Sequence, residues 1–442
     1  FEGTQSAALK VTGALTGTAM ATGGSGSTTG ASIGTGRISL LVRKSTANFG
    51  SLSLTLGGSA VIAAAPESFI AVRDGTLTVD GAMAISTPGK LSITSETNGK
   101  VVAGSIALTA GDFVADSVQP NPTNPGSYSA GSWSVSTGNN FLASTNIISG
   151  SDFLVNAPGR IEIYSVNTTG SIDLRAQGGS LLARNLVSGG SILLRASTNI
   201  DLDTMDAGVN IDALASTGFV DVGNVLAKGN AIITAGSFVK AIDLDVDGYL
   251  QVFANSSSIT GNTILAGGMK FIANGDVLIG NVLTDFAATI QSTTGKVTTG
   301  NIDAQYSVSV DAAGNIQLGK IDSKFGDVML KSQNGKIDGG VINSGERILA
   351  SALGNITLTD LTTSANFSEG VGTDIIIDSG AAVSVRDVVS KGGIHIIADG
   401  TIATDDLAAT NDVVLLAAGN IATASLTAGA GRDIFIANAS MS

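Results

Sequence analysis

The sequence is poor in several residues that commonly carry chemistry. Its 442 residues include no cysteine, one histidine and one tryptophan, and aromatic residues make up only 4% of the chain. Without cysteine the chain can form neither a disulfide framework nor a thiolate metal site. The same absence says little about the compartment in which the protein works.

Prolines, long apolar runs and positive charge are also scarce. No segment reaches the roughly 18 uninterrupted apolar residues of a membrane-spanning helix, and no amphipathic helical period persists. Six prolines suit a chain whose backbone N–H groups are nearly all needed in strand ladders. The net charge of −13 argues against a nucleic-acid or anionic-membrane partner. We therefore expect no nucleic-acid partner and no membrane insertion.

The chain is instead rich in glycine, with 58 residues, and in one short phrase built around a glycine. The phrase is clearest at residues 308–321, with the sequence VSVDAAGNIQLGKI. Apolar and polar residues alternate before Gly314, which is the period of a strand with one buried face. The glycine indicates a corner that needs positive φ or close packing.

Equivalents of this corner recur along most of the chain. They stand at positions 111, 139, 159, 179, 198, 218, 236, 257, 275, 295, 314, 335, 354, 381, 400 and 419. The second residue after every corner is apolar, and the seventh is apolar after fourteen of the sixteen. The two exceptions, Asn146 and Asp243, each have an isoleucine beside them, Ile147 and Ile242. The recurrence indicates a structural repeat.

The repeat predicts an all-β fold, a right-handed parallel β-helix (a solenoid) of about 19–20 residues per rung. Each rung would hold three short strands, and equivalent residues of successive rungs would stack. Ile302, Ile321 and Ile342 are expected to form such a ladder. Parallel strands joined by crossover connections favour the right-handed winding. A solenoid also accounts for the length, because each rung packs only on its neighbours.

Three regions follow from the regularity of the repeat. Residues 1–36 form a lead-in rich in Gly, Thr, Ser and Ala, or irregular opening rungs; residues 37–110 form irregular rungs; residues 111–442 form a regular β-helix. Loop insertions are expected near 119–133, which holds half of the prolines, and near 361–374. Their aromatic residues Tyr128, Trp133 and Phe367 are interaction candidates. They could contact a glycan or a protein, or pin the loops onto the solenoid.

The repeat unit I-x-L-x-A-x-G-x-I, at residues 192–200, 308–316 and 413–421, resembles the haemagglutinin repeats of filamentous-haemagglutinin-type exoproteins. That family consists of bacterial surface adhesins exported by two-partner secretion. The resemblance covers residues 111–442 well and the first hundred residues poorly. It implies a β-helical shaft and a secreted or cell-surface location. The run Asn121 to Pro125 differs from the Asn-Pro-Asn motif of the family's secretion domain.

Candidate catalytic residues are few. Asp405 and Asp406 resemble the paired carboxylates of β-helical polysaccharide hydrolases, which also need further acids, a histidine and basic substrate clamps on the same face. The single histidine, His395, alternates with Ile394 and Ile396, so its side chain is expected to point to solvent. We expect no catalytic site and no enzymatic activity.

One acidic run raises the question of calcium. Asp243, Asp245 and Asp247 match the opening of an EF-hand loop, but Ala254 stands where the closing glutamate is required. The residues between these aspartates alternate like a strand that turns its carboxylates outward. No cofactor is expected, and calcium on these three aspartates is the alternative to a role in solubility and edge protection.

Three classes of function remain. The first is a structural or adhesive shaft at a bacterial surface or outside the cell, and the second is a filament subunit that stacks end to end. The third is a carbohydrate-active enzyme or a tailspike. The chain begins at Phe1 and offers five residues after Ala437, too few to cap a rung. We therefore expect a processed chain or a fragment whose last rung stacks on further repeats or on a neighbouring copy. A surface glycan or protein is the other expected partner.

Overall fold

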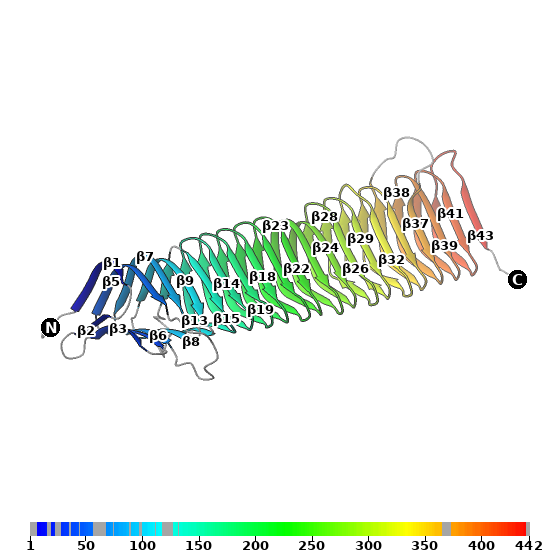
Figure 1. Cartoon of the computed structure of the whole chain (residues 1–442). Coiled ribbons are helices and arrows are strands. Elements are labelled where there is room, and N and C mark those ends of the chain that lie inside the picture. The colour runs from blue at the N-terminus through cyan, green and yellow to red at the C-terminus, as the bar shows by residue number, and fades with distance from the viewer. Residues whose placement is uncertain are drawn as a thin grey trace. The chain divides into compact units, whose positions relative to one another are not determined.

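The chain folds into β-strands, and the described residues include no helix. A computed structural model describes residues 7–15, 19–22, 28–34, 37–43, 45–55, 68–73, 75–87, 90–96, 100–110, 112–116, 127–130, 132–364 and 373–438. These ranges accordingly offer no helix long and apolar enough to cross a membrane. The chain divides into two compact units, Phe1–Lys228 (unit 1) and Gly229–Ser442 (unit 2), whose strands are labelled in Figure 1.

Unit 1 is built from strands that pair mainly in parallel with the strand one turn later. The strands are β1 (Ala7–Leu15), β2 (Ala19–Thr22), β3 (Thr28–Gly34), β4 (Arg37–Arg43), β5 (Ser45–Thr55), β6 (Ser68–Arg73), β7 (Thr76–Ser86), β8 (Lys90–Glu96), β9 (Lys100–Ala110), β10 (Asp112–Asp116), β11 (Ser127–Ala130), β12 (Trp133–Thr137), β13 (Phe141–Ser149), β14 (Phe153–Ala157), β15 (Ile161–Thr168), β16 (Ile172–Ala176), β17 (Leu181–Ser188), β18 (Ile192–Ala196), β19 (Ile200–Ala207), β20 (Ile211–Ala215) and β21 (Val220–Ala227).

Unit 2 continues the same pattern of parallel pairing among its own strands. The strands are β22 (Ala231–Ala235), β23 (Val239–Ala254), β24 (Ile259–Ala273), β25 (Val277–Thr284), β26 (Ala288–Ser292), β27 (Val297–Thr299), β28 (Ile302–Ala304), β29 (Val308–Ala312), β30 (Ile316–Gln317), β31 (Ile321–Ser323), β32 (Val328–Ser332), β33 (Ile337–Asp338), β34 (Ile342–Ser344), β35 (Ile348–Ala352), β36 (Ile356–Thr363), β37 (Thr373–Ser379), β38 (Val383–Ser390), β39 (Gly393–Ala398), β40 (Ile402–Ala409), β41 (Val413–Ala417), β42 (Ile421–Thr427) and β43 (Ile434–Asn438).

A rung has three arms, seen most simply in β27, β28 and β29, which we call the first, second and third arm. In other rungs the first two arms merge into one bent strand, as in β36. Partners on regular successive rungs are about 20 residues apart, as Val297 pairs with Ile316 and Ile316 with Ile337. The predicted fold class, a parallel β-solenoid of three short strands per rung, is confirmed.

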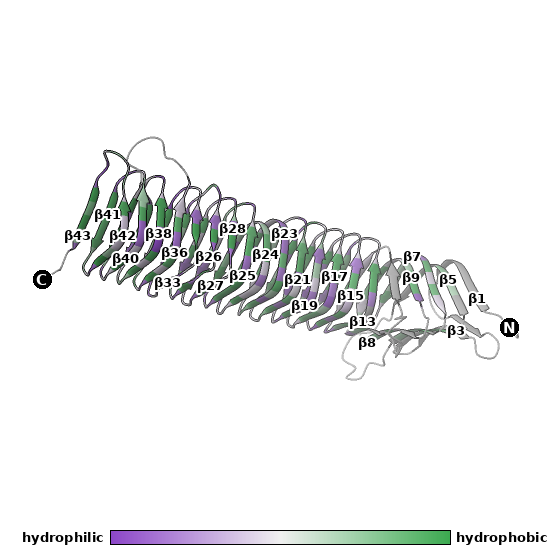
Figure 2. Cartoon of the chain, turned by 180° about the vertical axis from the view of Figure 1, so that it is seen from behind, coloured by the Kyte–Doolittle hydropathy of each residue, from purple (hydrophilic) through white to green (hydrophobic). Residues whose placement is uncertain are grey.

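Burial follows the alternation in the sequence. In β29, Val308, Val310 and Ala312 are buried, whereas the residues between them are partly exposed. Figure 2 shows the same alternation of hydrophobic and hydrophilic residues along many strands. The expected ladder is also present, because Ile302 pairs with Ile321 and Ile321 with Ile342, all of them fully buried. Each such side chain contributes about 1.5–3 kcal/mol through burial.

Close packing, rather than positive φ, explains the glycine at the corners. Among the described residues only Gly431 is a glycine with positive φ. A Cβ placed on Gly335 would lie 2.5 Å from Oδ1 and 2.6 Å from the backbone N of Asn315 on the preceding rung. That Oδ1 accepts a hydrogen bond of 3.0 Å from the backbone N–H of Lys336. The glycine thus makes room for a side chain that ties one corner to the next.

One rung lies one residue out of the predicted register. The repeat placed Phe238 inward, but Val239 is buried and Phe238 is only partly buried. The isoleucine expected to replace Asp243, Ile242, is 49% exposed, and Leu244 takes the inward place. The observed register turns Asp243 outward with its neighbouring aspartates, whereas burying unpaired carboxylates would be costly.

The beginning of unit 1 departs from the parallel pattern. Strand β3 pairs antiparallel with both β2 and β4, so this part of the lead-in is an antiparallel meander and not a set of opening rungs. Strand β1 does pair in parallel with β5. Strands β5, β7 and β9 then stack with register shifts, such as the one between Phe49 and Leu52. These shifts fit the irregular rungs predicted for residues 37–110.

Part of each predicted insertion belongs to strands of the solenoid. Strand β11 lies within the predicted insertion at 119–133, yet it pairs in parallel with β9 and β13 as part of a rung. The second insertion was predicted at 361–374, but its first three residues end β36 and its last two begin β37. Residues 117–126, 131 and 365–372 lie outside the described ranges.

Candidate functional site

Unit 2 carries three exposed aromatic side chains in a row, which we call the aromatic ladder: Phe286, Tyr306 and Phe325. They are 61%, 48% and 64% exposed, respectively. The ring centroids of Phe286 and Tyr306 are 6.0 Å apart with planes 10° from parallel, and those of Tyr306 and Phe325 are 6.2 Å apart at 51°. Exposed aromatic residues on three successive rungs form an unusual surface for a chain with so few aromatics.

The ladder arises from one position in the rung, the turn between the second and third arms. Phe286 lies between β25 and β26, Tyr306 between β28 and β29, and Phe325 between β31 and β32. Backbone hydrogen bonds hold these turns together, since Tyr306 N–H donates to Phe286 O over 3.3 Å. Phe325 N–H likewise donates to Gln305 O over 2.9 Å. The turns are therefore as regular as the strands they join.

The sequence contains the signal for this ladder, and it was missed. Each aromatic residue stands eleven residues after a predicted corner, at 275, 295 and 314. The inward strand positions do not reveal the aromatic ladder, because its three residues lie in turns, where the alternation of the strands does not apply.

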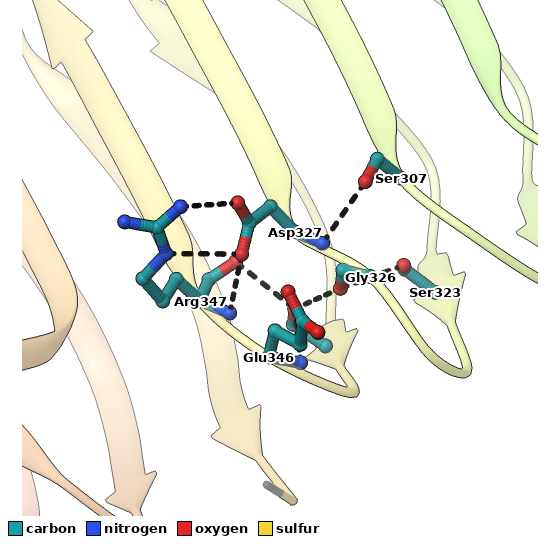
Figure 3. A network of polar contacts seen from close by, with 7 residues as sticks. Ser307, Ser323, Gly326, Asp327, Glu346 and Arg347 are labelled. Atoms are coloured by element: carbon teal, nitrogen blue, oxygen red, sulfur yellow. Dashed lines mark hydrogen bonds and ion pairs between the residues drawn. The ribbon is translucent and has the colours of Figure 1, made fainter. Parts of the chain in front are cut away.

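A polar network fixes the turns on one side of the aromatic ladder (Figure 3). The hydroxyl of Ser323 lies 2.8 Å from Tyr306 O and 2.9 Å from Gly326 O, and that of Ser344 lies 2.8 Å from Gly326 O. Gly326 is buried, and a Cβ there would come within 2.5 Å of the Ser307 backbone N. The hydroxyls therefore tie the turn of Tyr306 to the next two turns.

An ion pair extends the network. The Arg347 guanidinium donates to both carboxylate oxygens of Asp327, over 3.1 and 2.6 Å, and Arg347 N–H donates to the same carboxylate over 3.0 Å. Partial burial opposes ionisation of Asp327, but these hydrogen bonds and the charge of Arg347 outweigh it and hold the pKa of Asp327 below its ordinary value. The carboxylate thus stays charged and anchored.

Asp374 occupies the equivalent place on the rung after Arg347, and its environment has the opposite effect. The side chain is almost completely buried, and no hydrogen bond of good geometry reaches either oxygen. Burial raises the pKa of Asp374, although Gly392 N–H, the nearby hydroxyls of Thr363 and Ser390 and the charge of Arg347 partly offset the effect. Its charged form is therefore disfavoured.

Unit 1 has a hollow of about 700 Å³ on the outer side of β13, β15, β17 and β19. Three of the charged residues that line it, Arg160, Glu162 and Arg184, have partners inside it; Asp201 and Asp203 line it as well. Arg160 and Glu162 form an ion pair of 2.5 Å, and the Arg184 guanidinium carbon lies 5.3 Å from the centre of the Tyr164 ring. Because these charged groups already have partners inside the hollow, it offers weaker polar contacts to a ligand than its volume suggests.

Comparisons with known proteins do not add a relative. No family model, no curated protein and no solved structure matches this chain. The chain's own repeat and the two surfaces described above are the features that bear on its function.

The calcium candidates form a strand and are not gathered into a site. Asp243, Asp245 and Asp247 lie on β23 with their side chains outward. The next rung places Thr263 beside Asp243 and Leu265 beside Asp245, so it supplies no carboxylate at either place. Within the described ranges, no group of three or more His, Asp or Glu side chains could hold a metal ion.

The paired carboxylates and the histidine lie on different arms. Asp405 and Asp406 are exposed in the middle of β40, and Asp406 pairs in register with Asp387. His395 lies on the third arm in β39, between Ile376 and Val414 of the neighbouring rungs. Its side chain points outward as predicted but is only partly exposed, and its Nε2 is enclosed without a hydrogen-bond partner. The apolar neighbours explain why the expected contact with solvent is incomplete.

Trp133 is not an exposed loop residue, so its interpretation as a partner-binding candidate is wrong. It begins β12 and is fully buried in the inward position shared by Ile106 and Phe153. Its ring packs edge-on against Phe153 at 5.9 Å, and its indole N–H donates to Ile148 O over 3.3 Å. The proline-rich run ends before this residue, and burying the large indole stabilises the core.

The other two aromatic candidates remain predictions. The backbone of Tyr128 belongs to β11 and pairs in register with Val101 and Ile147, so it lies on a strand of a rung. Phe367 falls outside the described residues.

Proposed function

We propose that this chain is a non-catalytic structural shaft of a secreted or bacterial cell-surface fibre. The observation that carries the proposal is the unbroken inward ladder of unit 2. In the second arm it runs from Val282 through Ile302, Ile321, Ile342, Leu361, Val388 and Leu407 to Leu426. The inward residues of such a core serve to stack one rung on the next, and this supports a structural role for the unit.

The resemblance of the repeat unit to haemagglutinin repeats supports the same proposal and supplies the location. An adhesive role would then belong to surfaces that project from the rungs, because loops and turns vary without disturbing the ladders.

The proposal is tested in the source cells. An antibody against the chain should label intact cells or their medium, and protease added outside should remove the cell-bound signal. Purified protein should release no reducing ends from a panel of polysaccharides. Labelling only after lysis would contradict the location, and turnover of a polysaccharide would contradict the absence of catalysis.

A second candidate, end-to-end assembly, is favoured by strand β43. Ile434 and Ile436 are 46% and 50% exposed, although their in-register partners Val413 and Leu415 are fully buried. These two residues continue an inward ladder, and a further rung from the same protein or from a second copy would cover them.

Sedimentation separates this candidate from the simple shaft. If copies stack through β43, the chain should form concentration-dependent oligomers, and Ile434→Lys with Ile436→Lys should abolish them. A matched change of the outward residue between them, Phe435→Lys, should have a smaller effect. A monomer at all concentrations would contradict assembly by this chain.

A further inference from the structure

The aromatic ladder is the surface feature that the shaft function leaves unexplained. Leaving Phe286, Tyr306 and Phe325 largely exposed forgoes the stabilisation that their burial would give. The turn does not require an aromatic residue, because Glu346 occupies the position equivalent to Phe325 in the next rung. The shared placement of the three rings therefore suggests recognition of something that repeats along the rungs.

The spacing suits a ligand made of flat rings linked in a line. The two centroid separations, 6.0 and 6.2 Å, are nearly equal; the first two ring planes are near parallel, and the third is tilted by 51° from the second. The negatively polarised face of an aromatic ring attracts the weakly positive C–H groups on the apolar face of a pyranose. A row of such rings can therefore hold consecutive sugars of one chain.

Polar groups accompany each ring in the way that sugar hydroxyls require. Asp285 precedes Phe286, Gln305 precedes Tyr306 and Lys324 precedes Phe325, and all three have side chains at the surface. The Asp285 carboxylate can accept hydrogen bonds, the Lys324 ammonium can donate them, and the Gln305 amide can do both. Sugar hydroxyls both donate and accept, so they can use all three.

The charges near the ladder favour an uncharged glycan over a polyanion. The neighbouring cations are held in ion pairs with carboxylates: Lys320 with Asp322 at 3.1 Å, Lys324 with Asp303 at 3.7 Å and Arg347 with Asp327 at 2.6 Å. Asp285 and Glu346 add further negative charge at the same turns. Sulfated or uronic-acid chains would be repelled, whereas a neutral chain pays no such penalty.

We propose that Phe286, Tyr306 and Phe325 form a binding surface (the platform) for an extended, uncharged polysaccharide, whose sugar rings contact the exposed parts of the aromatic rings. The chain lies along successive rungs, and the residues preceding the rings hydrogen-bond its hydroxyls. The platform goes beyond a structural shaft, because it gives the shaft a specific ligand. It does not depend on where the protein is located.

Calorimetric titration of the purified chain tests the platform. The probes are cellohexaose, mannohexaose and xylohexaose as neutral extended chains, and a heparin hexasaccharide as the anionic arm. We expect binding of at least one neutral hexasaccharide and none of the anionic one. Tyr306→Ala should weaken binding about tenfold, the size of one lost aromatic contact. Tyr306→Phe should stay within about twofold of the unchanged protein, because it keeps the ring.

Two further variants separate sugar stacking from general hydrophobicity and from loss of fold. Phe286→Leu keeps an apolar side chain without the ring and should weaken binding as much as Phe286→Ala. Leu353→Ala removes an apolar side chain, 62% exposed, from outside the ladder and should leave binding unchanged. Circular dichroism checks that each variant keeps its strands.

Several results would overturn the proposal. They are no binding of any neutral hexasaccharide, binding of the heparin hexasaccharide alone, and unchanged affinity after Tyr306→Ala. Full retention of binding by Phe286→Leu would show that the rings act only as apolar surface and would equally refute stacking. Failure of the platform would leave the shaft proposal standing, since that rests on the inward ladders.

Discussion

The two units use aromatic residues in opposite ways. In unit 1, Phe113 and Phe141 stack at 5.0 Å inside the solenoid, and Trp133 meets Phe153 edge-on at 5.9 Å, all four of them buried. In unit 2, the three rings of the aromatic ladder lie at similar separations but face solvent, Phe286 and Tyr306 being stacked and Phe325 tilted against Tyr306. The ring type and the spacing are shared, so the difference lies in the position within the rung.

That difference separates two roles of a repeated position. An inward aromatic residue replaces an aliphatic one in a ladder, as Trp133 does between Ile106 and Phe153, and fills more of the cross-section. An exposed aromatic residue in a turn does not fill the interior of the solenoid, and its ring is available to contact a ligand. The contrast predicts large effects of inward changes on stability and small effects of changes in the turns.

The sharpest form of the contrast uses adjacent residues. Ile316→Asp would bury a carboxylate between Val297 and Ile337 and should cost about 4 kcal/mol or more. Gln317→Ser, one residue on and facing outward, should change stability by less than about 0.5 kcal/mol; a neutral residue is used because Asp338 lies in register beside this position. Urea unfolding followed by circular dichroism measures both. Equal losses would contradict the inward and outward assignment.

The aromatic core of unit 1 should be nearly as sensitive. Phe153→Ala removes a fully buried ring from between Trp133 and Phe141 and should cost about 3–5 kcal/mol. Trp133 is the only tryptophan, so its fluorescence reports unfolding at this place. Tyr164→Ala, at a partly exposed ring in the same unit, is the control and should shift the transition far less. Similar shifts would argue against a packed aromatic core.

Two carboxylates at equivalent places in unit 2, Asp327 and Asp374, should respond to pH in opposite directions. The lowered pKa of Asp327 means that it stabilises the fold above its ordinary pKa and loses this effect as pH falls through the lowered value. The raised pKa of Asp374 means that its favourable contribution exists at low pH and is lost as pH rises through the raised value.

Asp327→Asn should therefore destabilise at neutral pH, and Asp374→Asn should stabilise, each by roughly 1 kcal/mol. The difference at Asp374 should vanish in acid, where its carboxyl group is protonated. The difference at Asp327 should begin to shrink only below its ordinary pKa, because its lowered pKa keeps the folded-state carboxylate charged there. Melting temperatures between pH 3 and 7 measure them, taking pH 3 as about one unit below the ordinary pKa of aspartate. The same sign for both variants at neutral pH would contradict the assigned environments.

The smallest effect on stability is expected in the aromatic ladder. Tyr306→Ala removes ring contacts at a half-exposed turn and should cost about 0.5–1 kcal/mol. The measurement is the same urea titration used for Ile316→Asp. A loss as large as that of Phe153→Ala would mean that the ladder belongs to the structural core, and the contrast between the units would fail.

The inward ladders could be predicted because burial has a strict period in the sequence. Ile302, Ile321 and Ile342 share one offset from their corners and lie where that offset placed them. The failure of register at Val239 and Leu244 came from two apolar neighbours, Phe238 and Val239, either of which fits the pattern. The aspartates further along the strand decide between Phe238 and Val239, because they face outward only if Val239 faces inward.

The surface features were harder to predict because they depend on contacts between rungs. Trp133 follows a proline-rich run and was grouped with it, although the alternation of Trp133, Ser134 and Val135 already matched a strand. The aromatic ladder required a comparison of turns instead of strands. The antiparallel pairing of β3 with β2 and β4 occurs where glycine, serine and threonine leave no clear period to interpret.

The direction of the hydrogen bonds between rungs has a mechanical consequence. Bonds such as Val297 N–H to Asn315 O, at 2.9 Å, and Ile316 N–H to Lys336 O, at 2.8 Å, point from one rung to the next. A force that pulls the first and last rungs of a unit apart acts along these bonds and breaks those of an end rung first. Each rung that peels away frees about 20 residues, or roughly 65 Å of extended chain. Under tension the unit would lengthen in steps of that size, as an extensible tether does.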